Sequence, residues 1–169
     1  MINKELQKIL LTMTKADQDL RFNPQKIKTK FHVIDTSNTE KLKKIIKQYG
    51  WPDQKLVGIK GAQAAWLITQ HADHDLSFQK KCLVLMKEKY KEELVGPKDV
   101  ALLIDRVLVN SGKSQKYGTQ FYTNKKVEYT FRPISVKKSV NKRRKEMGLD
   151  TFESYQAHIQ KVRAKHIKK

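Results

Sequence analysis

Apolar side chains recur every three or four residues along most of the chain, which is the spacing of an amphipathic α-helix. The repeat is clear over residues 2–20 and resumes after Ser37, which forms a capping-box pattern with Glu40 and indicates a helix start. That second helix is predicted to end at Tyr49, just before a Gly-Trp-Pro sequence. Between the two helices, residues 31–34 are expected to form a short extended segment.

Further helical segments follow, most of them closed by glycine or proline. They cover residues 62–72, 78–94, about 99–112, 136–147 and 151–168. The period changes near residue 117, where two runs of aromatic and β-branched residues flank an Asn-Lys-Lys loop, a pattern typical of a β-hairpin. The chain is therefore predicted to be mainly α (an α+β fold), with about six helices and a single β-hairpin near residues 117–132. Its 169 residues fit one domain, residues 1–169, ending in a basic helix over residues 151–168.

The net charge of +19 favours anionic partners such as nucleic acid, nucleotides, phosphorylated ligands or acidic proteins. Lysine and arginine clearly outnumber acidic residues from Arg132 to the end of the chain. An alternative explanation is that a lysine-rich composition only keeps the protein in solution. Cys82 is the sole cysteine, so neither an intrachain disulfide nor a cysteine zinc cage can form. No signal-peptide pattern and no membrane-spanning apolar run occurs, so a reducing cytoplasm is the expected location.

Four segments occur in a characteristic order: GWP at residues 50–52, QHAD at 70–73, DRVLVNSGKSQKYGTQ at 105–120, and RRKEMGL at 143–149 with Tyr155 after it. Together they resemble an uncharacterised bacterial family of unknown function, over about residues 17–155. The resemblance implies no established activity, so it supports the predicted fold more than a function. The cofactor, the oligomeric state and the biological pathway stay open.

The QHADHD segment, residues 70–75, contains candidate catalytic groups. His71 is a candidate general acid or base because imidazole titrates near neutral pH, and Asp73 is a candidate to orient it. Two histidines and a carboxylate can also hold a metal, but the HExxH spacing is absent and no metal ligand is assigned. Alternatively, His71 only interacts with a helix C-terminus.

Asp105 lies within the apolar run LLIDRVLV and therefore needs either water or a polar partner. One hypothesis ties it to Arg143 or Arg144 as a structural ion pair. The other places it as a catalytic carboxylate in a pocket beside His71.

The segment GKSQKYGTQF, residues 112–121, is the strongest binding candidate. It offers uncharged hydrogen-bonding side chains close together, with two glycines that permit close backbone approach. The candidate ligand-binding residues are Gln115, Tyr117, Thr119 and Gln120. Arg143 and Arg144 are candidates for binding an anion bidentately, and Gln18 and Arg21 could add polar groups.

These features favour a small enzyme, a hydrolase or transferase, or a ligand-binding domain acting on a polar, anionic, nucleotide-like ligand, with His71 as acid or base. One alternative is a nucleic-acid-binding protein that uses the basic C-terminal helices and the hairpin aromatics. Another is a partner-binding module, such as an immunity or inhibitor protein, with an exposed apolar patch ringed by lysine.

Overall fold

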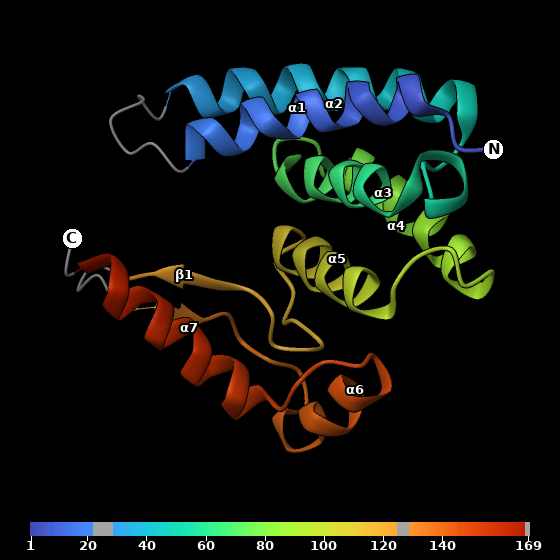
Figure 1. Cartoon of the computed structure of the whole chain (residues 1–169). Helices are drawn as coiled ribbons and strands as arrows, with labels where there is room; N and C mark the ends of the chain where they lie inside the picture. The colour runs from blue at the N-terminus through green and yellow to red at the C-terminus, as the bar shows by residue number, and fades with distance from the viewer. Residues whose placement is uncertain (22–28, 125–128, 168–169) are drawn as a thin grey trace. The chain divides into compact units, whose positions relative to one another are not determined.

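The computed structural model describes residues 1–21, 29–124 and 129–167, and contacts between residues divide the chain into two compact units (Figure 1). The first unit is Met1–Gly96 and the second is Pro97–Lys169. The sequence predicts one domain over residues 1–169. Within the described residues, no helix is long and apolar enough to cross a membrane.

The first unit is built entirely from helices where it is described. They are α1 (Lys4–Arg21), α2 (Thr29–Tyr49), α3 (Gln54–His71) and α4 (Leu76–Lys91). Figure 1 shows α1 and α2 side by side. The buried side chains of α1, including Leu6, Leu10 and Met13, follow the helical period and form the core with Leu42 of α2 and Val57 of α3. Apolar burial of this kind is the main stabilising contribution to the unit.

Helices α1 and α3 run in the same direction along each other. Near their N-termini, the backbone N–H of Asn3 donates to Leu56 O at 2.8 Å, and Gln7 Nε2 donates to Val57 O at 2.7 Å. Near their C-termini, Asp17 meets His71. Gly58 has φ +70° and interrupts α3 at the place where Gln7 enters. The parallel alignment therefore places the C-terminal ends of α1 and α3 next to each other.

The second unit combines helices with the hairpin. Its elements are α5 (Pro97–Asn110), β1 (Phe121–Thr123), β2 (Tyr129–Phe131), a 3-10 turn (Lys137–Ser139), α6 (Val140–Glu146) and α7 (Phe152–Ile167). The strands are antiparallel, with Phe121 opposite Phe131. The ring of Phe131 contacts that of Phe152 edge-on at a centroid distance of 5.0 Å, which attaches α7 to the hairpin.

The mainly α fold with one hairpin is confirmed, but some element boundaries are wrong. Residues 31–34 are helical rather than extended, because α2 begins at Thr29 and places Ser37 in its interior instead of at its start. The strands are shorter than predicted, and residues 125–128 of the expected hairpin lie outside the described residues. The predicted helix from residue 136 begins as a 3-10 turn, since Val136 has a left-handed backbone with φ +46°.

Candidate functional site

His71 is the last residue of α3, and its ring faces a buried carboxylate on α1. Its Nδ1 lies 3.0 Å from Oδ2 of Asp17, whose side chain is 4% exposed. Nδ1 is buried, and although it lies close to the carboxylate oxygen, the two groups are not aligned for a hydrogen bond. Gln18 Nε2 donates to the same Asp17 oxygen at 2.6 Å. Asp17 therefore faces both the imidazole and an amide donor.

Arg21 and Asp35 complete a charged network around Asp17. Arg21 Nε donates to Asp17 Oδ1 at 2.8 Å, and its Nη2 donates to both oxygens of Asp35 at 2.7 and 2.8 Å. The Arg21 guanidinium also lies 5.3 Å from the centre of the Phe31 ring. Helices α1, α2 and α3 each contribute to this network, which fixes the Asp17 carboxylate in one orientation.

The electrostatic setting keeps Asp17 ionised. Burial alone would raise the pKa of its carboxyl, but the contacts with His71 and Arg21 outweigh burial and lower that pKa to about 2. For Asp35, burial raises the carboxyl pKa although Arg21 opposes the shift. The network therefore presents a permanent negative charge beside Nδ1 of His71.

Oxygen or nitrogen atoms of Asp17, Asp35 and His71 lie within 4.8 Å of one another, close enough for one metal ion. Arg21 already donates to both carboxylates, and its positive charge occupies the place that a cation would need. The donor set therefore fits a charged hydrogen-bond network better than a metal centre.

Asp73 and Asp75 of QHADHD have structural partners. Gln79 Nε2 donates to Asp73 Oδ1 at 3.2 Å, so Asp73 joins the start of α4 to the end of α3. Asp75 caps α4 by accepting from Phe78 N at 2.9 Å, and its other oxygen pairs with Lys43 at 2.8 Å. The carboxylate found beside the ring of His71 is thus Asp17, while Asp73 bonds elsewhere.

In the second unit, Asp105 is fully buried and binds backbone N–H groups of the turn that follows α5. Its Oδ1 accepts from Lys116 N at 2.6 Å and Tyr117 N at 3.0 Å. Its Oδ2 accepts from Thr119 N at 2.9 Å and Thr119 Oγ1 at 3.0 Å. Among the described residues these bonds, rather than the hypothesised ion pair with Arg143 or Arg144, satisfy the carboxylate, because backbone amides of the turn reach it directly.

The candidate residues of GKSQKYGTQF mostly point inward. Gln115 is fully buried: its Nε2 donates to Gln120 O and Arg132 O, and its Oε1 accepts from Gln120 N at 2.7 Å. Tyr117 is 4% exposed and Thr119 is 5% exposed. Gln120 Oε1 accepts from Arg106 Nη1 at 3.1 Å. These side chains hold the turn and the hairpin together.

Arg143 and Arg144 bind main-chain carbonyls. Arg143 donates to Lys116 O at 2.8 Å and Ser135 O at 2.7 Å. Arg144 is 1% exposed, and it donates to Asp150 O and, at 2.7 Å, to Tyr117 O. Burial lowers the pKa of Arg144, against the opposing effect of Tyr155. Both guanidinium groups fasten α6 to the Asp105 turn.

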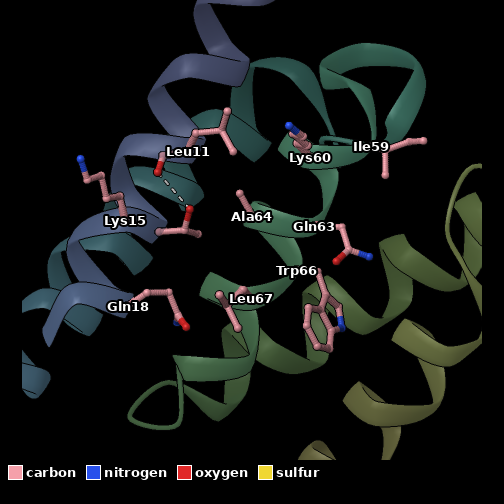
Figure 2. A pocket seen from close by; sticks show the side chains of 10 residues that line it. Leu11, Lys15, Gln18, Ile59, Lys60, Gln63, Ala64, Trp66 and Leu67 are labelled. Carbon is pink, nitrogen blue, oxygen red and sulfur yellow. Dashed lines mark hydrogen bonds between the residues drawn. The ribbon is translucent and has the colours of Figure 1, made fainter. Parts of the chain in front are cut away.

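A groove in the first unit lies between α1 and α3 (Figure 2). Its cavity volume is about 490 Å³, within the range of small-molecule sites. Leu11 and Gln18 line it from α1, and Ala64, Trp66 and Leu67 line it from α3. Gln18 thus connects this groove to Asp17 and the His71 network.

The structure gathers His71 with Gln18 and Arg21, and adds Asp17 and Asp35, which were not among the residues predicted from the sequence. One signal for Asp17 existed. It falls on the same helical stripe as Leu6, Leu10, Met13 and Leu20, all buried, and a carboxylate at a core position requires charged partners. The remaining candidates belong to the other unit: Asp105, Gln115, Tyr117, Thr119, Gln120, Arg143 and Arg144.

Comparisons with known proteins identify a family but no characterised relative. No curated protein and no solved structure matches this chain. Residues 4–168 match DUF6624, a family of unknown function, and the chain therefore belongs to that family.

Proposed function

We propose that the first unit carries an acid–base site in which His71, with the Asp17 carboxylate beside its Nδ1, exchanges a proton with a polar, anionic ligand. The chemistry would be hydrolysis or group transfer. The observation that carries the proposal is the 3.0 Å approach of His71 Nδ1 to a buried carboxylate that is itself bonded to Arg21. A carboxylate at one ring nitrogen favours a proton on that nitrogen and leaves the other available as a base.

The exposed side of His71 supports this role. Its side chain is 19% exposed, and among the described residues none hydrogen-bonds its Nε2. A purely structural histidine would ordinarily satisfy both nitrogens inside the protein. The QHAD and DQDLR segments then contribute jointly to one site, with His71 in the first and Asp17 and Arg21 in the second.

The reactivity of each histidine towards diethyl pyrocarbonate, followed by mass spectrometry, tests the proposal without knowledge of the substrate. In a buffer alkaline enough to keep imidazole neutral, we expect His71 to be modified several-fold more slowly in Asp17→Asn than in the parent protein, because the carboxylate that orients the ring and increases its nucleophilicity is lost. Asp19→Asn is the matched control, since Asp19 is exposed on the same helix. Equal His71 rates in all three proteins would refute the assignment.

A turnover screen extends this test to chemistry. The full chain is incubated with p-nitrophenyl esters, p-nitrophenyl phosphate and nucleoside triphosphates. Any turnover is expected to fall about 100-fold or more in His71→Gln, the usual contribution of a general acid or base. His74→Gln should keep the turnover, since His74 contacts His32 at a ring distance of 5.6 Å rather than Asp17. Turnover that survives in His71→Gln would exclude this histidine as the acid or base.

Nucleic-acid binding by the second unit is a second candidate function, favoured by the exposed hairpin aromatics. Phe121 and Tyr122 are 36% and 40% exposed, and the Arg132 guanidinium lies 4.5 Å from the centre of the Tyr122 ring. Bases stack on such rings. Binding of single-stranded DNA or RNA should weaken steeply with salt and drop further in Tyr122→Ala. Undetectable binding at low salt would exclude this function.

A further inference from the structure

The groove between α1 and α3 points along both helices towards His71. On α3, the lining residues Lys60, Ala64 and Leu67 continue at helical spacing to His71, one turn beyond Leu67. On α1, the lining residues Leu11 and Gln18 continue in the same way to Arg21. Because the two helices run parallel, both lines of side chains lead to the same charged network.

The lining of the groove defines the chemistry of its occupant. Most of its accessible surface is apolar, contributed by side chains such as Leu11, Ile59 and Leu67, and Trp66 stands at its edge in Figure 2. Its charged residues are Lys15 and Lys60, and none of the ten lining residues is acidic. An apolar floor with cations at its margin complements a molecule that has an apolar body and a negative group.

We propose that this groove is the binding site of a small amphiphilic anion, an aromatic or aliphatic carboxylate, sulfonate or phosphate. Its body lies over Ala64 and Leu67, Lys15 and Lys60 at the margins of the groove attract its charge, and one end reaches Gln18, beside the His71 network. The inference rests on the proposed function of His71 and adds the class of ligand and the direction from which it enters.

The size of the groove favours a small molecule over a protein partner. A volume of about 490 Å³ holds a ligand of ordinary drug or mononucleotide size. The hollow is formed by α1 and α3 alone within the first unit. A protein partner or a second copy of the chain would need a much larger contact area, near 800 Å² on each side.

Two fluorescent dyes test the proposal directly. The probe 1-anilinonaphthalene-8-sulfonate has an aromatic body and a sulfonate, and N-phenyl-1-naphthylamine has the same body without charge. We expect the sulfonate dye to bind the full chain with one-to-one stoichiometry. Its affinity should fall about 2- to 5-fold for each lysine removed in Lys15→Gln and Lys60→Gln, the usual range for an exposed charge pair. The neutral dye should be unaffected by these two changes.

Matched variants separate the groove from general attraction by a basic protein. Lys55→Gln removes an exposed lysine of the same helix outside the groove, and the sulfonate dye should bind it as tightly as the parent. Leu67→Glu should weaken sulfonate binding much more than Leu67→Gln, since both variants lose the same apolar contact and differ only in charge. Equal weakening in Lys55→Gln and Lys60→Gln would overturn the proposal.

A final pair of measurements keeps this inference distinguishable from the function of His71. The sulfonate dye should bind His71→Gln normally, and at saturation it should slow modification of His71 in the parent protein by blocking the approach along the groove. Dye binding without protection of His71 would overturn the direction of entry and leave the acid–base proposal standing. A dimer in light scattering that dissociates in Leu67→Glu, with no dye binding to the parent, would overturn the ligand assignment.

Discussion

Replacing Asp105 by Asn should destabilise the second unit more than any other conservative change to an acidic side chain there. The carboxylate is fully buried and receives four separate donors: three backbone N–H groups and the Thr119 hydroxyl. An asparagine keeps the shape but replaces one oxygen with an NH₂ group, which cannot accept. Whichever oxygen is lost, the N–H of either Lys116 or Thr119 faces another donor inside the protein.

The magnitude follows from these contacts. A buried N–H left without an acceptor costs about 1–3 kcal/mol, and the bonds that remain lose the strengthening that an ionised acceptor provides. Together these effects indicate a loss of about 3 kcal/mol in the free energy of unfolding. The backbone amides of Tyr117 and Thr119 should then exchange their hydrogens about a hundredfold faster, because local opening becomes easier by the same free energy.

Urea denaturation followed by circular dichroism, combined with amide hydrogen exchange, measures both quantities. Asp99→Asn on the same helix is the control: burial raises the pKa of Asp99, so losing its charge should cost little or even stabilise. A loss below about 0.5 kcal/mol in Asp105→Asn, or a loss equal to that of Asp99→Asn, would refute the view that this carboxylate organises the turn.

Three further outcomes are expected. The pKa of Asp17 is about 2, against an ordinary 3.8, so the ionised carboxylate stabilises the fold above pH 4 by roughly 2 kcal/mol. This contribution should disappear as the pH falls from 4 to 2, and the melting temperature of Asp17→Asn should therefore decline less over that range than that of the parent. An identical decline in the two proteins would contradict the assignment. Arg144→Lys should lower the free energy of unfolding by about 2 kcal/mol, since a lysine cannot bridge Asp150 O and Tyr117 O. Arg143 is only half-buried, so Arg143→Lys should cost less in the same urea experiment. The reverse order would be inconsistent with these contacts. Gly118→Ala should lower the free energy of unfolding by about 2 kcal/mol or more, because φ is +71° and a Cβ would lie 2.8 Å from the Phe152 ring. Gly112 has a similar φ of +72° but open space around it, so Gly112→Ala should lower the free energy of unfolding by only about 1 kcal/mol. Equal losses would mean that movement of Phe152 relieves the clash.

Local signals in the sequence predicted most helices well, and long-range contacts explain the errors. The expected helix start at Ser37 followed a genuine capping pattern, yet α2 begins at Thr29. The extra turns lie beside α1, where Asp35 bonds Arg21 and the Phe31 ring lies near the same guanidinium. No local pattern contains the information that Arg21, fourteen residues away from Asp35, will meet it. Propensity and capping are therefore overridden by tertiary contacts at this helix end.

The need of Asp105 for a polar partner was predictable, but the identity of the partner was not. A carboxylate in an apolar helix requires donors, and arginine is the common expectation. Here the donors are backbone amides, brought together by the left-handed conformation of Gly118 within the turn. Backbone N–H groups carry no sequence signature, so only the folded geometry reveals them.

Polarity alone did not distinguish a binding site from a scaffold, and the unused hydrogen-bonding capacity of a side chain is the better criterion. The polar residues of the Asp105 turn looked suited to a ligand, but Gln115 and the Asp105 carboxylate bond to main-chain groups of their own unit. His71 differs because its ring contacts one buried carboxylate through Nδ1 and retains an exposed edge. This contrast is why we place the proposed chemistry at the end of α3. The groove between α1 and α3 shares in this chemistry through Gln18, which alone among the groove-lining side chains bonds Asp17 within the described residues.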